Sequence, residues 1–445
     1  MANARQPASH KHASATATGA DGVYSPHIMK QHSVPFAPHV ETLPNGVTVV
    51  VDSVASVDSA AVGIWINAGT RDEPRGKAGV AHFVEHTSFR RTLTRTTNRI
   101  AREFENVGAY ANAYTTKEET CFYARTLSEH LPRVATVLAD VVLHPVFDAG
   151  DVEKERTIIT EEIRAYEDEA EEFIFDMGEQ QVFGDHPLGP PIVGTADSVQ
   201  RITADDVRRF HESHYHAGAL TLTVSGNVDP NRIIDIATGL FETASPRRRA
   251  SRRQAPRQRA VEPLTLRRPV QQAHVLWQAR TPGLHDHARH ALLLLNTLMG
   301  DGMSSRLNVR IRERKGLAYN IYSQLQLFGD CGVFAVYAGL DERHVSNVGT
   351  MLEQELSLLI ERGVTRTELA RAKQQLRASK IMSLESLSAR MSMLGKGMLE
   401  DGHPEDPYET ITRIDAVTLD EVHDIARRVL APEMFHQCLV LPLED

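Results

Sequence analysis

Cysteine is scarce in this sequence: three residues occur among 445, and they lie far apart at Cys121, Cys331 and Cys438. An odd and dispersed set predicts neither a disulfide framework nor a Cys-x-x-Cys metal site, and it is typical of a reducing compartment. Long apolar runs are missing as well, since no stretch approaches the roughly 20 residues of a membrane span. We therefore expect a cytoplasmic protein with no membrane partner.

An excess of positive charge is also absent, because 58 acidic residues outnumber 49 basic ones and give a net charge of −9. With 41% hydrophobic and 24% charged residues, the composition is that of a globular protein and not of a general nucleic-acid binder. One basic, proline-punctuated run, from Ser245 to Pro263, departs from this balance. A nucleic-acid patch would explain the run, but its place at the middle of the chain favours a linker between two domains.

The length of the chain predicts two domains of about 200 residues each. Residues 1–37 are rich in Ala, Ser, His, Thr and Pro without an apolar period, which predicts a disordered tail. An organellar targeting segment is the less favoured alternative for this tail, because it carries little arginine and no amphipathic pattern. We place the first domain at 38–243, the basic interdomain linker at 244–263 and the second domain at 264–445.

Strand and helix patterns alternate through the first domain. Apolar runs bounded by turn residues predict strands, and an apolar residue every three or four positions predicts a helix. The predicted strands are 47–51, 59–67, 112–115 and 120–124, and the predicted helices are 97–107, 131–143 and 152–166. We expect Asp151 to cap the last of these helices, and Ile158, Ile159, Ile163 and Tyr166 to form its apolar stripe.

The second half of the chain repeats features of the first. The segment Ile202–Val207 precedes a predicted helix and strand, and Val417–Val422 does the same near the C-terminus. A helix over 366–381 corresponds to the acidic helix over 152–166, but basic residues largely replace the acids. These patterns predict an α+β fold made of two homologous domains, each a sheet with helices. We expect a metal site in the first domain only.

The segment His82-Phe83-Val84-Glu85-His86 carries two histidines four residues apart and a glutamate directly before the second. On a helix, residues i and i+4 share one face, so the two imidazoles can bind one small cation. Catalytic zinc takes three protein ligands and a water, and H-x-x-E-H is the inverted form of a zinc-protease motif in which the glutamate is the base. Because the chain has 21 histidines, a surface helix can also carry this five-residue pattern by coincidence. A third ligand further along the chain decides between a zinc site and coincidence.

The acidic helix over 152–166 lies downstream and carries the second half of the chemistry. Glu155 and Glu162 are seven residues apart, so they lie nearly in register after two turns. A solvated helix face is the alternative interpretation of such acids, and we favour it for Glu153, Glu161 and 167–171.

Together, the H-x-x-E-H motif and Ile158–Ile163 resemble the pitrilysin-type, or inverzincin, zinc metallopeptidases, in the subgroup of the mitochondrial processing peptidase and its bacterial homologues. In that family the third zinc ligand lies some 76 residues after the second histidine, in a helix that reads Val-Ile-x-Glu-Glu-Ile. The resemblance, with 162 − 86 = 76, implies that His82, His86 and Glu162 bind Zn²⁺. It also implies that Glu85 is the general base and that Glu155 supports the site.

The same resemblance assigns residues to the substrate. Phe89 matches a family position after the motif, and the segment Gly108–Thr115 is similar to an edge strand that binds extended peptides by β-addition, with contacts from Asn112 and Ala113. Glu172 and Asp176 correspond to acids that receive a substrate arginine in the mitochondrial enzyme.

In the second domain, Ile311–Tyr319 resembles the family's arginine and tyrosine pair, which implies that Arg312 holds a substrate carbonyl and Tyr319 donates to the oxyanion. An exposed helix charge is the alternative for Arg312. Relatives of this length complete the active site across two subunits. Because this chain carries both the zinc set and the pair, the resemblance favours a homodimer over a heterodimer with a related subunit.

Two segments depart from the family pattern or from a tempting motif. Arg91 stands where the family usually has glycine, so the turn after Phe89 must be built differently if that glycine needs a positive φ. The segment Gly300–Ser305 is glycine-rich, but it lacks a following Gly-Lys-Ser/Thr, and we interpret it as a turn before a helix and not as a phosphate cradle.

The motif and the resemblance predict a zinc metalloendopeptidase that hydrolyses extended or unfolded peptides inside a closed chamber. We expect this peptidase to prefer arginine-containing substrates. The alternative is a non-catalytic scaffold subunit of the same fold that binds presequences or peptides. The presence of the three ligands and Glu85 favours the enzyme.

Overall fold

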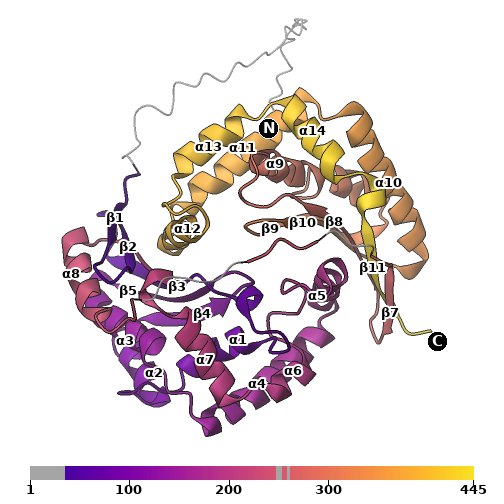
Figure 1. The fold of residues 1–445 in the computed structure, drawn as a ribbon. Coiled ribbons are helices and arrows are strands. Elements are labelled where there is room, and N and C mark those ends of the chain that lie inside the picture. Colours follow the sequence, from indigo (N-terminus) through magenta and orange to yellow (C-terminus); the bar gives the residue numbers. More distant parts are fainter. Residues whose placement is uncertain (1–35, 247–252, 258–260, 445) are drawn as a thin grey trace, which may run out of the picture. The chain divides into compact units, whose positions relative to one another are not determined.

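The computed structural model describes residues 36–246, 253–257 and 261–444 (Figure 1). The predicted tail therefore lies outside the described residues, apart from its last two positions, and so does much of the predicted linker. The chain from Pro38 onward forms one unit. No helix in the described ranges combines the length and apolar character needed to cross a membrane.

The first sheet has six strands in the order β1-β2-β6-β3-β5-β4, and only the pair β2 and β6 is parallel. Strand β4 pairs with β5 alone among the described residues, with Ala113 opposite Phe122, so its other edge carries no strand. The bounds are β1 His39–Thr42, β2 Thr48–Ser53, β3 Ser59–Ile66, β4 Tyr110–Thr115, β5 Thr120–Leu127 and β6 Leu220–Gly226.

Helices of the first half cover one face of this sheet, with α3 against β3 and β5 and α1 against β4. The helix α3 has the predicted bounds, because His144-Pro145 follows its last apolar residue. The bounds are α1 Val80–Ser88, α2 Thr97–Glu105, α3 Leu131–Leu143, α4 Ala149–Asp168, α5 Ala170–Phe183, α6 Ala196–Arg201, α7 Ala204–His214 and α8 Pro230–Leu240.

The start and the buried stripe of α4 differ from the prediction. Asp148, and not Asp151, caps the helix, because its side chain accepts a hydrogen bond from the backbone of Gly150, while Asp151 lies inside the first turn. The buried stripe runs through Val152, Glu155, Ile159 and Ile163 at spacings of three and four residues. Ile158 is 44% exposed and Tyr166 39% exposed, so neither belongs to it.

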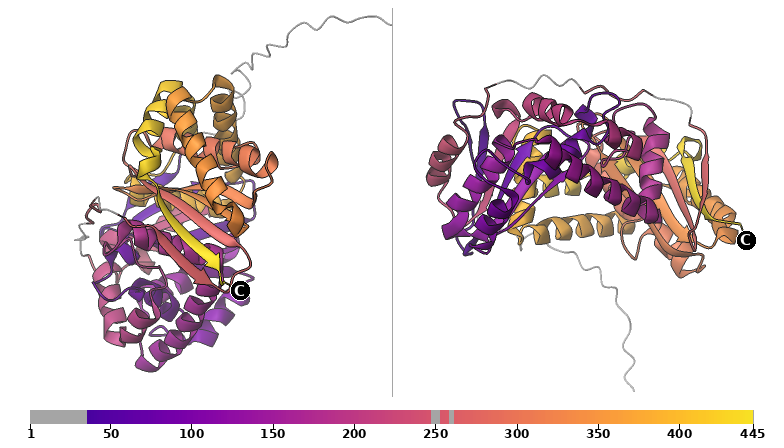
Figure 2. Two further views of the ribbon diagram at one scale, coloured as in Figure 1. Left: turned by 90° about the vertical axis from the view of Figure 1, so that its right-hand side faces the viewer. Right: turned by 90° about the horizontal axis from the view of Figure 1, so that it is seen from below.

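The second sheet has five strands in the order β7-β11-β8-β10-β9, and β11, the yellow strand near the C-terminus in Figure 2, lies between β7 and β8. The strands are β7 Leu264–Arg268, β8 Ala273–Thr281, β9 Ala318–Leu327, β10 Gly332–Leu340 and β11 His436–Pro442. The helices are α9 Arg289–Met299, α10 Val345–Arg362, α11 Arg366–Ser383, α12 Leu387–Glu400, α13 Pro407–Ala416 and α14 Leu419–Val429.

The predicted repeat is visible in how two corresponding helices begin. Thr203 and Asp206 form a capping box at the start of α7, and Thr418 and Glu421 form the same box at the start of α14. The α+β fold of two similar halves is thus confirmed. Six short elements complete the described part of the chain: the 3₁₀ turns η2 Thr70–Asp72, η3 Ser128–His130, η4 Ala217–Ala219, η6 Glu342–His344 and η7 Pro432–Met434, and the π-helix η5 Asn308–Glu313.

Each half places one helix against the sheet of the other half. Helix α12 packs on β3 and β6, and α5 packs on β8 and β11. Glycines permit both approaches: a Cβ on Gly395 of α12 would lie 2.0 Å from the ring of Trp65, and one on Gly178 of α5 would lie 1.7 Å from the amide nitrogen of Gln278. Strand β3 is consequently buried on both faces, which explains why its sequence does not alternate between apolar and polar residues.

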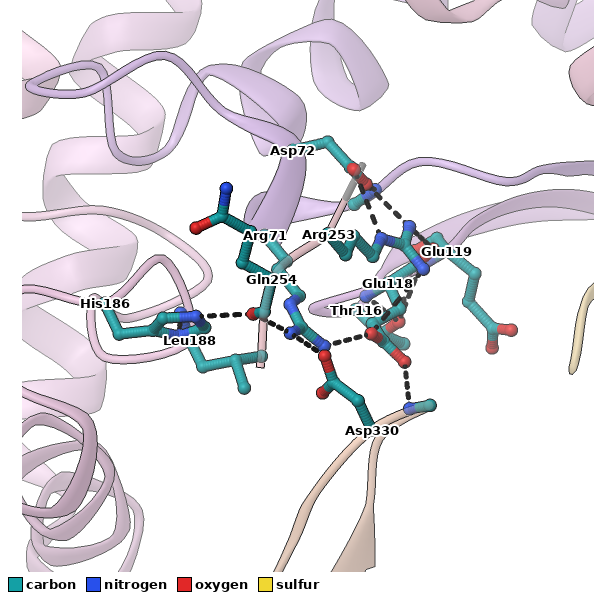
Figure 3. A network of polar contacts seen from close by, with 12 residues as sticks. Arg71, Asp72, Thr116, Glu118, Glu119, His186, Leu188, Arg253, Gln254 and Asp330 are labelled. Atoms are coloured by element: carbon teal, nitrogen blue, oxygen red, sulfur yellow. Dashed lines mark hydrogen bonds and ion pairs between the residues drawn. The ribbon is translucent and has the colours of Figure 1, made fainter. Parts of the chain in front are cut away.

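A buried arginine also links the halves (Figure 3). The side chain of Arg71 is 2% exposed and donates to Glu118 at 2.6 Å and to Asp330 at 2.7 Å. It donates in addition to the backbone carbonyl of Gln254 at 2.6 Å. Because Asp330 lies in the turn between β9 and β10, these contacts connect that turn with the first half and with the segment that joins the halves.

Candidate active site

The helix that carries the histidine motif begins at a special backbone position. Gly79, its N-cap, has a φ of +93°, and a Cβ there would lie 2.8 Å from the carbonyl oxygen of Val193. The carboxylate of Glu73 accepts hydrogen bonds from the backbone of Gly79 at 3.0 Å and of Ala81 at 2.9 Å, so it occupies the open N-terminus of α1. These contacts fix the start of α1, and its apolar residues, among them Phe83, pack into the core.

The structure brings the three predicted zinc ligands together. One donor atom from each of His82, His86 and Glu162 lies within 4.8 Å of the others, and these residues form the one such group of three metal-ligating side chains among the described residues. Oε2 of Glu162 lies 3.8 Å from Nε2 of His82 and 3.6 Å from Nε2 of His86. The ligands come from helices α1 and α4, which pack against each other.

The spacing of these atoms fits a zinc ion. Direct hydrogen bonds would bring the heavy atoms to roughly 2.7–3.2 Å. Donors that surround zinc tetrahedrally at about 2.0–2.2 Å lie about 3.4 Å apart. The observed 3.6 and 3.8 Å separations between the imidazole nitrogens and Glu162 are close to the second value, and all three donor atoms lie within 4.8 Å of one another, so the set can surround a zinc ion.

Glu155 contacts the Nδ1 side of the second histidine, His86. Its Oε2 lies 3.0 Å from Nδ1 of His86, and its other oxygen accepts from the guanidinium of Arg90. The contact with Nδ1 favours a proton on that nitrogen and leaves Nε2 of His86 free to bind a metal. Nδ1 of His82, by contrast, is buried without a hydrogen-bond partner among the described residues.

Thr115 at the end of β4 contacts the predicted base. Its hydroxyl donates to Oε2 of Glu85 at 2.6 Å, and its side chain is buried. Strand β4 lies against α1, so this hydrogen bond joins the open edge of the sheet to the motif helix. The contact fixes the orientation of the Glu85 carboxylate.

The electrostatics of the site favour a positive ion. Burial, and to a smaller extent the neighbouring His86, lower the pKa of His82 to about 3, so His82 is neutral. Burial opposes a proton on His86 too, but the hydrogen bond with Glu155 and the charges of Glu85 and Glu162 outweigh it and raise the pKa of His86. Burial raises the pKa values of Glu85 and Glu162 themselves. Carboxylates thus lie around the two imidazoles. The negative charges that raise the pKa of His86 would also attract a metal cation.

A cavity of about 350 Å³ opens beside these residues. It is lined by the four motif and ligand side chains and by residues from β4, from α4 and α5, and from the segment before α6. The lining residues are His82, Glu85, His86, Ala113, Tyr114, Thr115, Glu162, Tyr166, Glu172, Asp176, Ile192 and Val193.

The structure distributes the predicted substrate residues unevenly. Ala113, Glu172 and Asp176 line the cavity, and burial raises the pKa of Asp176 to about 6. Asn112 does not line the cavity: it lies on the open edge strand β4, where its side chain contacts the hydroxyl of Tyr110 at 3.2 Å. Phe89 lies outside the cavity as well, because its ring packs against the core 5.7 Å from the ring of Phe122.

Arg312 and Tyr319 lie away from the cavity of their own chain. Arg312 is exposed on the π-helix η5, where its guanidinium contacts Asn308 at 3.4 Å, and Tyr319, near the start of β9, is 84% exposed. Neither side chain lines the cavity beside His82.

The turn after Phe89 places Arg91, at the position of the missing glycine, in a β-bridge. Arg91 pairs with Thr96 in an antiparallel bridge, and its side chain lies 3.2 Å from Asp151. An extended residue of any type fits such a bridge, so arginine is tolerated there.

Sequence reasoning missed three residues that shape the site: Thr115, Tyr166 and Arg90. Thr115 belongs to the segment 108–115 that the resemblance identified, but nothing in the sequence indicated its contact with Glu85. Tyr166 was interpreted as part of the buried stripe of α4 and lines the cavity instead. Arg90 directly follows Phe89, and its contact with Glu155 depends on how α1 and α4 pack.

Comparisons with known proteins give the family. The sequence matches the family described as insulinase, peptidase family M16, over residues 48–196, and the M16 inactive domain over residues 201–376. It is 39% identical over 399 residues to an uncharacterized zinc protease of Mycobacterium tuberculosis, which covers 89% of this chain and 91% of the relative. It is 33% identical over 392 residues to the uncharacterized zinc protease YmxG of Bacillus subtilis, with 88% and 95% covered.

Solved structures with the same fold include an M16 inactive domain from Pseudomonas fluorescens, with a TM-score of 0.86, 18% identity and coverage of 92% of this chain and 98% of that chain. A protease from Helicobacter pylori has a TM-score of 0.83 and 20% identity, with 91% and 100% covered. The extent of the sequence match, with the fold and the H-x-x-E-H motif, agrees with the predicted pitrilysin-type family. This chain belongs to peptidase family M16.

Proposed function

We propose that this chain is a zinc-dependent endopeptidase that hydrolyses extended or unfolded peptides inside a closed chamber. The observation that carries the proposal is the convergence of His82, His86 and Glu162 around one point, with Glu85 beside them in the same cavity. The zinc-protease names of the relatives from Mycobacterium tuberculosis and Bacillus subtilis agree with it.

In this proposal the three ligands hold the metal and Glu85 moves the proton. Zinc bound to His82, His86 and Glu162 would supply a Lewis acid that activates water and polarises the scissile carbonyl. The carboxylate of Glu85, oriented by Thr115, accepts the proton of the attacking water and passes it to the leaving amine. Glu155 keeps His86 in the tautomer that presents Nε2.

The substitution Glu85→Gln tests the enzyme against the scaffold. We expect the purified wild type to contain zinc and to cleave an unfolded peptide, and Glu85→Gln to keep its zinc but lose cleavage. Glu161→Gln is the matched control, because Glu161 is an exposed acid on α4 whose one ion pair among the described residues is with Arg164. A wild type free of zinc and inactive would indicate a non-catalytic, peptide-binding subunit instead.

The open edge of β4 supports the proposal that the substrate binds in an extended form. A peptide added to this edge would form backbone hydrogen bonds beside Asn112 and Ala113. Because Ala113 and Thr115 also line the cavity, a strand bound there would pass directly in front of Glu85. Peptides that contain proline at the paired positions should therefore be poor substrates, since proline lacks the N–H that the edge requires.

An arginine preference is the finer part of the proposal. Glu172 and Asp176, four residues apart on α5, both line the cavity and could pair with a guanidinium by charge-assisted hydrogen bonds. The test compares kcat/KM for a peptide with arginine near the cleavage site and for its citrulline variant, which keeps the shape and loses the charge. Equal values would contradict the preference.

We also propose that two copies complete each active site. The support is that Arg312 and Tyr319 are exposed and do not line the cavity of their own chain. In a homodimer each pair would face the zinc of the second copy, where the guanidinium and the phenol could stabilise the tetrahedral oxyanion.

Mixing two inactive variants tests this arrangement. We expect Glu85→Gln and Arg312→Ala to be inactive alone and to regain up to about a quarter of the wild-type activity when mixed, because half of the dimers would be mixed and each would have one intact site. No regained activity after subunit exchange would argue for action within one chain or for a heterodimer.

A further inference from the structure

A second cavity, of about 500 Å³, lies in the second half among three elements: the segment around η5, the end of α10 and the start of α11. We call it the arginine pocket, because its charged lining is dominated by arginine. The five arginines that line it are Arg306, Arg310, Arg314, Arg362 and Arg371.

Acids neutralise only part of this positive charge. Arg306 pairs with Glu368 at 2.8 Å, and Arg310 pairs with the buried Glu355. Five guanidinium groups and these two carboxylates leave a net charge of 5 − 2 = +3.

The remaining three arginines have no acidic partner among the described residues. The structure shows a single side-chain contact for them, from Arg371 to the backbone carbonyl of Ser304 at 3.3 Å. Arg314 and Arg362 are exposed, and their guanidinium groups make no ion pair or hydrogen bond within the described ranges. Like charges gathered around a hollow repel one another, and an anion in the hollow would remove that cost.

The lining suits an oxyanion such as phosphate better than a protein surface. Each guanidinium offers a planar fork that matches two phosphate oxygens, and none of the five cations is a lysine. The apolar lining is limited to Val309 and Leu358, whereas protein interfaces usually have a larger apolar centre. No aromatic ring lines the pocket, so nothing there would stack on a nucleotide base.

We propose that the arginine pocket is a binding site for a small phosphate-bearing anion, either an inorganic oligophosphate or the phosphate chain of a nucleotide, which it recognises without reading the base. The site is separate from the candidate active site, with which it shares no lining residue. Its occupancy therefore does not depend on whether the chain is a peptidase.

Isothermal titration of the full chain with sodium tripolyphosphate tests the proposal. The informative variant is the double substitution Arg314→Gln, Arg362→Gln, because neither arginine pairs with an acid whose charge would be left alone. Arg133→Gln is the matched control: Arg133 is exposed on α3, lines neither cavity and has no ion pair among the described residues.

We expect tripolyphosphate to bind the wild type and Arg133→Gln equally, and the double variant at least about 10-fold more weakly, since two charge-assisted contacts are lost. Because oligophosphates also bind zinc, the difference between variants carries the test. No saturable binding, or equal binding by the double variant, would overturn the proposal. If the double variant does not fold, Arg314→Lys and Arg362→Lys keep the charge and should each weaken binding, because the fork is lost; unchanged binding would overturn it as well.

Two further ligands separate the sources of the anion. ATP and GTP should bind equally well if the phosphates carry recognition, with tripolyphosphate at least as tight. Binding of ATP without tripolyphosphate would contradict recognition through phosphate alone. A synthetic peptide of the acidic segment 161–172 that binds where tripolyphosphate does not would overturn the proposal and identify a protein-docking surface.

Discussion

Replacing Thr115 with valine removes one hydroxyl from the end of β4 and keeps the size and β-branching of the side chain. That hydroxyl donates to Glu85 at 2.6 Å, and the residue is 8% exposed. A hydrogen bond to a charged group contributes about 1.5–3 kcal/mol. Because Glu85 borders a cavity that water can enter, we expect the lower end of that range, which corresponds to a roughly 10-fold fall in kcat.

The assay measures kcat and KM for one quenched fluorescent peptide, together with zinc content by mass spectrometry, for the wild type, Thr115→Val and Thr115→Ser. We expect KM to change less than about threefold, because the hydroxyl acts on the base and not on the bound peptide. Zinc should remain at the wild-type level, because Thr115 contacts none of the three ligands through its hydroxyl. Serine restores the donor and should recover most of kcat.

Three results would refute this reasoning. An unchanged kcat in Thr115→Val would mean that Glu85 is held by other contacts. A loss of zinc would move the effect from the base to the ligands. Failure of serine to recover activity would indicate that the methyl group, and not the hydroxyl, is what the site needs.

The remaining predictions concern the ligands, the link between the halves and the substrate acids. Glu155→Gln should weaken zinc affinity about 10- to 100-fold in a chelator competition, because the negative partner of His86 is lost. Arg71→Met should lower the free energy of unfolding in urea by about 1.5–3 kcal/mol, because the charge-assisted hydrogen bonds from the buried guanidinium to the partly exposed Glu118 and Asp330 are lost. Burial raises the pKa of Asp176 to about 6, so the carboxylate is charged above that pH and neutral below it. The ratio of kcat/KM for arginine over citrulline peptides should therefore be high above about pH 6 and fall as the pH drops through it.

Controls follow from the same contacts. Arg343→Met removes an ion pair whose arginine is 76% exposed, and it should cost less than about 1 kcal/mol. An Arg71→Met variant no less stable than Arg343→Met would show that the network in Figure 3 is not needed for stability. Unchanged zinc affinity in Glu155→Gln, or an arginine ratio that is flat between pH 5 and pH 8, would contradict the other two predictions.

Much of the fold was predictable where local patterns decide it. The bounds of α3 followed from its apolar stripe and from the proline after His144, and the similar segments Ile202–Val207 and Val417–Val422 indicated the repeat, in agreement with the capping boxes at Thr203 and Thr418. The predicted cap of α4, Asp151, was wrong, because Asp148 caps the helix and Asp151 lies in its first turn. Aspartate is a good cap at either position, and only the backbone geometry separates the two.

The metal-ligand residues of the candidate site were predictable from the sequence, but the residues that contact and orient the site were not. The i, i+4 spacing pointed to His82 and His86, and the resemblance supplied Glu162. The contact of Thr115 with Glu85 spans 30 residues and arises from the packing of an edge strand against a helix. No period or motif encodes such a contact. The predicted burial of Ile158 was wrong for a similar reason. Its exposure depends on which neighbours α4 contacts, and the sequence pattern does not specify them.

The helix that each half lends to the other has a consequence during synthesis on the ribosome. The face of β3 that carries Trp65 is covered by α12, which begins at Leu387, 387 − 65 = 322 residues later. At a synthesis rate of roughly 5–20 residues per second, about 16–64 s pass between the synthesis of this apolar face and that of the helix that covers it. The nascent chain therefore carries an exposed sheet surface for most of its translation, and it offers a binding site to chaperones throughout that interval.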